Sequence, residues 1–131
     1  MTYLIDTDWV IDHLNHIERV TRRLEELTPA GLALSIISLA ELYEGVYYSR
    51  DSVESEAALQ RFLNPELMIL GLDEATCKIF GKERGRLRTA GLMIGDCDLL
   101  IGATALRHKL TLLTNNRRHF ERIDGLRMES A

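Results

Sequence analysis

The chain has 131 residues, which is the size of one ordinary domain and leaves no room for a second, so we predict a single domain over residues 1–131. Hydrophobic residues make up 46% of the chain, and this excludes a disordered protein. Lys and Arg number 16 against 20 Asp and Glu, so the formal net charge is −4. This balance alone argues against a nucleic-acid partner, because such proteins usually carry excess positive charge.

The lengths of the apolar runs and the character of the first residues predict the cellular location of the protein. None approaches the roughly 18 residues that span a bilayer, and the first residues lack the basic start and long apolar stretch of a signal peptide. We therefore predict a cytoplasmic protein without a membrane partner. Cys77 and Cys97 have no metal-ligand spacing and are predicted to be free thiols that pack as small core residues.

Apolar residues occur in short runs and, between those runs, at helical spacing, which predicts alternating strands and helices. The predicted strands cover residues 3–5, 32–35, 67–70, 111–113 and, as a short fifth, 126–128. Helices are predicted at residues 8–15, 17–27, 38–48, 52–63, 74–90 and 98–108, with Thr7 and Asp73 as N-caps and Gly91 after the fifth helix. Parallel strands need crossover connections, so this order predicts an α/β fold with a parallel sheet of four or five strands covered by helices.

Acidic side chains lie near the ends of the predicted strands. Asp6 follows the first strand directly, and Glu41 lies early in the helix after the second. Asp96 and Asp98 open the helix before the fourth strand, which is followed by Thr-Asn-Asn at residues 114–116. Ligands of such folds bind at the carboxyl ends of the strands, where these residues can converge. Clustered carboxylates repel one another unless a cation joins them, and oxygen ligands suit Mg²⁺ or Mn²⁺.

Most of these acids also have a purely structural interpretation. Ser38 and Glu41 have the spacing of a helix capping box, in which Glu41 only accepts a bond from a backbone N–H. Asp96 and Asp98 are also suited to the first turn of a helix, where the macrodipole favours negative charge. Asp8 is predicted to be a solvated helix acid. The aspartate directly after the first strand has no such structural explanation.

Four short motifs occur in order along the chain. They are Leu-Ile-Asp-Thr-Asp at residues 4–8, Leu-Ala-Glu-Leu-Tyr-Glu-Gly at 39–45, Ile-Gly-Asp-Cys-Asp-Leu-Leu-Ile-Gly-Ala-Thr-Ala at 94–105, and Thr-Asn-Asn at 114–116 with His-Phe at 119–120. In this order and at these separations they resemble the PIN-domain ribonucleases, most of all the VapC toxins of bacterial type II toxin–antitoxin pairs. The resemblance covers nearly the whole chain. It implies a three-layer α/β/α PIN-like fold with a five-stranded parallel sheet, and an endoribonuclease that depends on Mg²⁺ or Mn²⁺.

The resemblance also implies roles for individual residues. The metal-binding acids of the family match four positions, which are Asp6, Glu41, Asp96 and Asp98. Of these, Asp6, Glu41 and Asp98 match the main catalytic acids, and Asp96 matches a frequent extra one. Thr114 is expected to offer its hydroxyl to a carboxylate or phosphate, and Asn116 falls where relatives carry Asp or Asn.

The same resemblance implies the partners. Its members cleave structured RNA such as transfer or ribosomal RNA, and so inhibit translation until an antitoxin binds them. It implies a homodimer and a cognate VapB-like antitoxin that lays its C-terminal segment in a groove beside the acidic site. The helices within residues 8–27 and 38–63 are candidate walls of that groove.

Two basic segments modify the conclusion drawn from the net charge. Residues 78–91 hold five Lys or Arg and one Glu, and residues 107–122 hold the same numbers, so each carries a local charge of +4. The four metal-site acids alone account for a charge of −4. We predict that Arg86, Arg88, Arg117 and Arg118 contact RNA phosphates, although each could also be a solvated surface charge. His119, like the other three histidines, is predicted to be a surface or packing residue.

Two alternatives remain open at this point. In a haloacid-dehalogenase-type phosphatase, Asp6 would be the nucleophile and Asp8 the general acid, but no Lys follows a strand and Glu41 would have no role. In a non-catalytic PIN-like scaffold, the same fold would only bind a partner.

Overall fold

The computed structural model describes residues 1–131 and contains a five-stranded parallel sheet with strand order β3-β2-β1-β4-β5. The strands are β1 (Tyr3–Ile5), β2 (Leu32–Ser35), β3 (Met68–Leu70), β4 (Thr111–Leu113) and β5 (Met128–Glu129). Leu4 of the central strand pairs with Ala33 of β2 on one side and with Leu112 of β4 on the other. All four strand pairs are parallel, as predicted from the strand–helix alternation.

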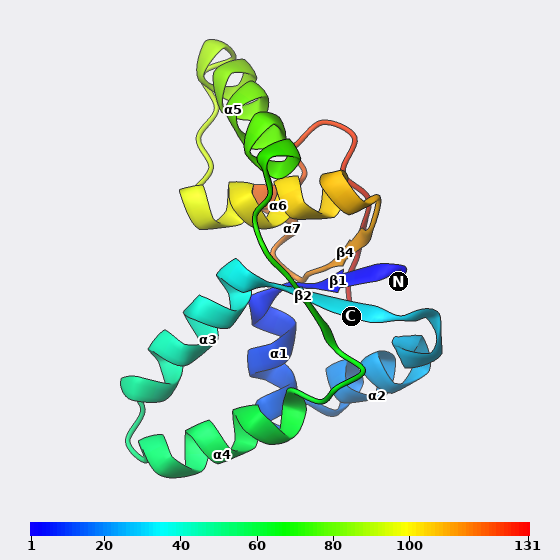
Figure 1. The fold of residues 1–131 in the computed structure, drawn as a ribbon, viewed down its shortest axis with the longest axis vertical. Helices are drawn as coiled ribbons and strands as arrows, with labels where there is room; N and C mark the ends of the chain where they lie inside the picture. The colour runs from blue at the N-terminus through cyan, green and yellow to red at the C-terminus, as the bar shows by residue number, and fades with distance from the viewer.

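Seven α-helices surround this sheet. They are α1 (Thr7–Leu14), α2 (Glu18–Leu27), α3 (Ile36–Tyr47), α4 (Ser52–Phe62), α5 (Glu74–Thr89), α6 (Asp96–His108) and α7 (Arg117–Phe120). Helices α1 to α4 lie on one side of the sheet, and α5 to α7 lie on the other, with α5 projecting away from it (Figure 1). The predicted three-layer α/β/α architecture is confirmed. None of the helices has the length and apolar character needed to cross a membrane.

The core consists of two apolar clusters, one on each face of the sheet. Consecutive residues of a strand point to opposite faces, so Leu4 belongs to the cluster under α5 and α6, whereas Ile5 packs against α1 and α2. The same division separates Leu112 from Leu113. Burial on both faces explains why the strands are short continuous apolar runs instead of alternating ones.

Several details of the helix ends differ from the predictions. Asp6, not Thr7, caps α1, because its carboxylate accepts the Thr7 N–H at 2.8 Å. Helix α3 begins two residues earlier than predicted, and Ser35 caps it by accepting the Ile37 N–H at 3.0 Å. Helix α7 was not predicted at all, since four residues are too few to carry a helical apolar pattern. The predicted Asp73 cap of α5 is confirmed.

The order of the strands shows where a ligand-binding crevice forms in this sheet. The chain runs from β1 outward to β2 and β3, and then crosses back to β4 on the opposite side of β1. The strand order therefore reverses between β1 and β4, and a crevice for ligands forms at the carboxyl ends of these two strands in such sheets. Asp6 follows β1 and Thr114 follows β4 at this point.

Candidate active site

The centre of the site is the carboxylate of Asp6, which is only 4% exposed. The end of β1 holds it in place, because the Asp6 N–H donates to the Leu113 carbonyl at 2.9 Å. One carboxylate oxygen caps α1 through the Thr7 N–H, and the other accepts the Thr114 hydroxyl at 2.7 Å. The side chains that follow β1 and β4 are therefore joined at the switch point of the sheet.

Asp8 is a second acid at the same place, and the prediction of a solvated helix acid is wrong. It is half-buried, and its Oδ2 accepts the backbone N–H of Asn115 at 3.0 Å. Its Oδ1 is buried without any hydrogen-bond partner. The reason is that α1 begins directly at the end of β1, so its first turn is held against the end of β4.

Burial and proximity shift the ionisation of both acids. Burial, followed by the charge of Asp8, raises the pKa of Asp6 to about 7. Burial is also the largest cause that raises the pKa of Asp8, while the bond from the Asn115 N–H lowers it. A buried carboxylate and a half-buried one beside it, the latter with an unpartnered oxygen, are a donor set that a divalent cation would satisfy.

Glu41 joins this centre through Thr7. The Thr7 hydroxyl donates to Glu41 Oε1 at 2.7 Å, so α1 and α3 are linked by their polar side chains. The capping-box interpretation of Ser38 and Glu41 is wrong, because α3 already begins after Ser35 and the Ser38 hydroxyl is buried without a partner. Glu41 therefore faces the site instead of the start of its own helix.

Asp98 lies in the first turn of α6 and contacts an unexpected partner. Its Oδ2 is 3.0 Å from Nδ1 of His119, which in turn lies 3.0 Å from the Asn116 side-chain amide nitrogen. A single ring nitrogen either donates to Asp98 or accepts from Asn116, so the tautomer of His119 decides which of the two it holds. The prediction of His119 as a mere surface or packing residue missed this contact, because the contact depends on the unpredicted helix α7.

Polar contacts connect these residues in a row across the sheet edge. The Asn116 N–H donates to the Thr114 hydroxyl oxygen at 2.9 Å, which closes the gap between the two halves. The contacts run in order through Glu41, Thr7, Asp6, Thr114, Asn116, His119 and Asp98, and the tautomer of His119 decides whether its Nδ1 bonds to Asn116 or to Asp98. No group of three or more acidic, histidine or cysteine side chains is arranged with metal-binding geometry. The structure thus brings five predicted site residues into one network without arranging a three-ligand metal cage.

Asp96 lies apart from this network. Its side chain is 82% exposed and forms an ion pair with Arg84 at 2.6 Å. Arg84 also donates to the Ile94 carbonyl at 3.0 Å, so the pair fastens the segment before α6 to α5. The next residue, Cys97, is exposed, and the prediction that it packs in the core is wrong, as it is for Cys77. Partial burial, and then the charges of Glu41 and the aspartates beside it, raise the pKa of the Cys97 thiol.

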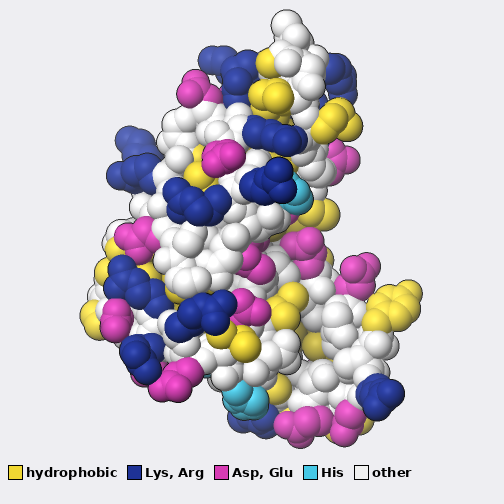
Figure 2. Space-filling model, turned by 180° about the vertical axis from the view of Figure 1, so that it is seen from behind, with side chains coloured by type: hydrophobic (Ala, Val, Ile, Leu, Met, Phe, Trp, Pro, Cys, Tyr) yellow, Lys and Arg dark blue, Asp and Glu magenta, His cyan; other side chains and the backbone are white.

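The four arginines predicted to bind RNA fall into two classes. Arg86 pairs with Glu83 and donates to the Arg122 carbonyl, and Arg117 donates to the Ser130 hydroxyl. Arg88 and Arg118 form no hydrogen bond or ion pair within the chain. Figure 2 shows that Lys and Arg side chains predominate on the upper half of the molecule, where α5 lies, that Asp and Glu side chains lie where the two halves meet, and that the lower half carries both kinds.

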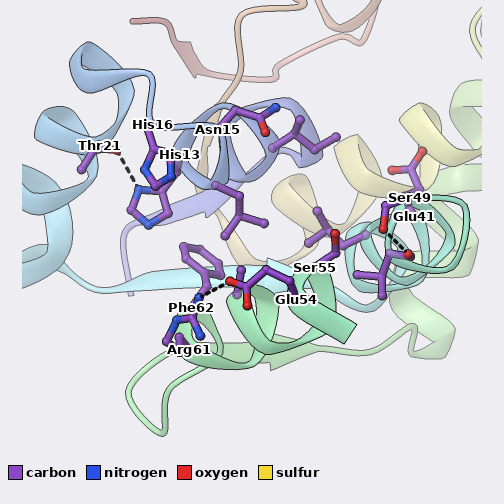
Figure 3. Close-up of a pocket in the computed structure, with 16 residues that line it drawn as sticks. His13, Asn15, His16, Thr21, Glu41, Ser49, Glu54, Ser55, Arg61 and Phe62 are labelled. Carbon is purple, nitrogen blue, oxygen red and sulfur yellow. Dashed lines mark hydrogen bonds and ion pairs between the residues drawn. The ribbon is translucent and has the colours of Figure 1, made fainter. Parts of the chain in front are cut away.

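A groove begins beside Glu41 and runs between the helices that cover the α1 to α4 side of the sheet. It has a volume of about 680 Å³ and is lined by 16 residues from the segments around α1, α3 and α4 (Figure 3). Glu41 lies at one part of this groove, and His13 and Phe62, whose rings are 5.4 Å apart, line another. The groove therefore connects the acidic site with a partly apolar surface.

Comparison with known proteins identifies the family. A model of the PIN domain matches residues 3–126. The ribonuclease VapC2 of Rickettsia felis is 35% identical over 132 residues, covering 99% of this chain and 98% of that protein. The tRNA(fMet)-specific endonuclease VapC of Shigella flexneri is 28% identical over 98% of this chain and 97% of its own length. The crystal structure of VapBC2 from Rickettsia felis, bound to a DNA fragment from their promoter, contains a chain that superposes with a TM-score of 0.92 at 34% identity, covering 99% of this chain and 98% of that one.

The chain therefore belongs to the PIN-domain family, within which it groups with the VapC proteins. The resemblance drawn from the four sequence motifs is confirmed, and the haloacid-dehalogenase alternative is set aside. In that alternative Glu41 had no role, whereas here it is bonded to Thr7 at the centre of the site.

Proposed function

We propose that the chain is the ribonuclease toxin of a type II toxin–antitoxin pair, and that it cleaves RNA with a divalent metal ion. The observation that carries the proposal is the buried Asp6 carboxylate beside Asp8, which is linked by hydrogen bonds through Thr7 to Glu41, with Asp98 at the same edge in contact with His119. Similar proteins named as VapC ribonucleases, one of them specific for tRNA(fMet), support RNA as the substrate.

Asp6, Glu41 and Asp98 are the residues proposed to hold Mg²⁺ or Mn²⁺. The unpartnered oxygen of Asp8 makes it a further oxygen donor beside them. Asp96 can take part only if it leaves Arg84. A bound divalent ion supplies Lewis-acid chemistry, because it lowers the pKa of water and stabilises charge on the phosphodiester.

The other residues of the network hold these acids in position. Thr114 keeps the Asp6 carboxylate oriented, and Thr7 does the same for Glu41. His119 holds Asp98 from the opposite side in the tautomer that carries the proton on Nδ1, and in the other tautomer it accepts from Asn116 instead. Orientation of this kind supports catalysis because acids that are already placed need not be reorganised in the reaction.

RNA is proposed to approach from the basic half of the molecule. Arg88 and Arg118 are the best candidates for phosphate contacts, since Arg86 and Arg117 already have partners within the chain. Structured RNA such as transfer or ribosomal RNA is the proposed substrate class, and inhibition of translation is the proposed consequence of its cleavage.

The proposed partners are a VapB-like antitoxin and a second copy of the chain. The structural relatives come from VapBC complexes, which supports an antitoxin partner. The groove beside Glu41 is the proposed seat of its C-terminal segment, as its volume of about 680 Å³ suits an extended or helical peptide. The homodimer rests on family membership alone.

The proposal is tested by cleavage of purified transfer and ribosomal RNA with and without Mg²⁺ or Mn²⁺. Glu41→Gln is expected to lower the cleavage rate by about 10- to 100-fold. Glu25→Gln, an exposed acid-to-amide change on α2, is the matched control and is expected to cleave like the wild type. If the folded wild type cleaves no RNA and does not arrest growth when expressed, the catalytic proposal fails and the PIN-like scaffold remains.

A further inference from the structure

Asn115 lies in the middle of residues 114–116, here called the site loop, and both its backbone and its side chain are bonded to distant parts of the chain. Its backbone N–H donates to Asp8 Oδ2 at 3.0 Å. Its side-chain Oδ1 accepts two bonds, from the indole N–H of Trp9 at 3.1 Å and from the N–H of Ala131 at 2.8 Å. One residue thus joins the site loop to α1 and to residues far away along the chain.

The C-terminal segment, residues 129–131, fastens the same loop from its other side. The Thr114 N–H donates to the Glu129 carbonyl at 2.9 Å, which continues the pairing of β4 with β5. The Ser130 hydroxyl donates to the Thr114 carbonyl at 2.7 Å. The site loop is therefore held between α1 and the C-terminal segment by both backbone and side-chain bonds.

The anchor on the α1 side is rigid. Trp9 is fully buried in the core cluster under the sheet, so its indole N–H cannot follow the loop if the loop moves. A satisfied bond between a buried donor and the Asn115 oxygen is strongly favoured, because leaving that donor unpaired would be costly.

The position of the site loop controls both halves of the row of polar contacts. The Thr114 hydroxyl orients Asp6, and the Asn116 side chain lies against His119, which contacts Asp98. Neither Thr114 nor Asn116 is bonded directly to Trp9 or Ala131. Asn115 lies between Thr114 and Asn116. Its bonds to Trp9 and Ala131 therefore fix the backbone on which both neighbours stand.

We infer that Asn115, together with residues 129–131, positions the metal-binding acids and that the C-terminal segment is part of the active-site architecture. The inference rests on the proposed nuclease function. Asn115 contacts Asp8 only through its backbone, and its side chain acts through the loop. It is therefore a positioning residue and not a catalytic one.

The test compares Asn115→Ala with Asn64→Ala in the full chain. Asn64 is the matched control, because its side-chain oxygen also accepts a backbone N–H, that of Glu66 at 2.9 Å, on a loop remote from the site. Three quantities are measured: Mn²⁺ affinity by calorimetry, hydrogen exchange of the site-loop amides, and kcat and KM for RNA at varied Mn²⁺ concentration.

Asn115→Ala is expected to weaken Mn²⁺ binding and to lower kcat by about tenfold or more, with KM for RNA within twofold of the wild type. The site-loop amides are expected to exchange faster, and the melting temperature is expected to fall below that of Asn64→Ala, because the buried Trp9 N–H loses its partner. A purely structural role would lower the melting temperature without changing kcat for each folded molecule.

Two further variants test the C-terminal anchor with less risk to folding. Ser130→Ala removes the hydroxyl bond to Thr114 together with the bond from Arg117, and a chain that stops at Glu129 also removes the Ala131 N–H. Both are expected to shift the same three quantities in the same direction, the shorter chain more strongly. Thr28→Val is the control, since it removes a hydroxyl-to-carbonyl bond of the same 2.7 Å length elsewhere.

The outcomes separate this inference from the proposed function. If the wild type cleaves RNA but Asn115→Ala matches its control in Mn²⁺ affinity, amide exchange and kcat, the inference is overturned. If the wild type cleaves no RNA, the proposed function fails, and Mn²⁺ affinity and amide exchange alone decide whether Asn115 positions the acids.

Discussion

The carboxyl edge of the sheet and the surface of α5 and α7 carry opposite charges and accommodate them differently. At the sheet edge, Asp6 is buried and Asp8 is half-buried beside it, and neither forms an ion pair with Lys or Arg. On the basic surface, Arg84 and Arg86 are neutralised by Asp96 and Glu83. The carboxylates of Asp6 and Asp8 thus have no ion-pair partner at a place where burial makes a charge energetically costly. Arg84 and Arg86, in contrast, are already paired with acidic side chains. That difference marks the sheet edge as the functional centre.

The largest expected effect comes from removing the central acid. Asp6→Asn keeps the size of the side chain and is expected to lower RNA cleavage by more than about 100-fold, because it removes a charged oxygen donor from the metal site. The same change relieves the repulsion with Asp8, so the metal-free variant is expected to melt at a higher temperature than the wild type. Cleavage assays and thermal melts measure the two effects. A variant that loses activity and stability together would contradict this account of the sheet edge.

The pH dependence of stability tests the same charge pair. The pKa of Asp6 is about 7 in the folded protein, far above its usual value, so the stability present at low pH is lost as the pH rises through about 7. The metal-free protein is therefore expected to melt several degrees higher at pH 5.5 than at pH 7.5, and saturating Mg²⁺ is expected to reduce that difference.

One histidine acts in the opposite direction within this range. Burial lowers the pKa of His13, so its contribution to stability is lost as the pH falls. The informative quantity is therefore the change of melting temperature with pH in the wild type minus the same change in Asp6→Asn. The contribution of His13 cancels in this difference. Equal slopes for the two proteins would show that Asp6 is not the titrating group.

The contact between α7 and α6 gives an intermediate effect. His119→Gln is expected to lower cleavage by about tenfold, since Asp98 loses the ring nitrogen that holds it. His108→Gln, at the far end of α6, is the control and is expected to have no effect. Cleavage rates at several Mg²⁺ concentrations would test this role, and it would fail if both histidine variants behaved like the wild type.

The basic surface predicts a smaller effect that differs between arginines. Arg118→Ala is expected to weaken RNA binding severalfold and to reduce the salt dependence of the affinity by about one ion. Arg86→Ala is expected to affect RNA binding less, because its guanidinium is already bonded to Glu83 and to the Arg122 carbonyl. Binding titrations at several salt concentrations distinguish the two, and equal losses would remove the distinction between free and paired arginines.

The smallest effect is expected at Asp96. Asp96→Asn is predicted to change cleavage by less than about threefold, since the side chain is exposed and paired with Arg84. A loss comparable to that of Glu41→Gln, measured in the same assay, would mean that Asp96 leaves Arg84 and joins the metal site.

Local patterns in the sequence predicted most of the fold because its elements are regular. Short apolar runs and helical spacing placed the first four strands and six of the seven helices, and the parallel sheet followed from their alternation; the fifth strand lies at Met128–Glu129 and shares only Met128 with its predicted range. Asp6 was identifiable because it directly follows a buried strand, where ligands of such sheets bind, although the structure shows that it also caps α1. The positions of Glu41 and Asp98 followed from the family motifs, but their partners did not.

Only the tertiary structure decided which side chains meet. Asp8 looked like a solvated helix acid, yet it is bonded to Asn115, 107 positions along the chain. The contacts of His119 with Asp98 and of Arg84 with Asp96 likewise join different helices. Spacing along one helix or strand is set by local geometry and can be read from sequence. Contacts between elements depend on how the sheet orders them, and here the reversal between β1 and β4 brings the acids and the site loop to one edge.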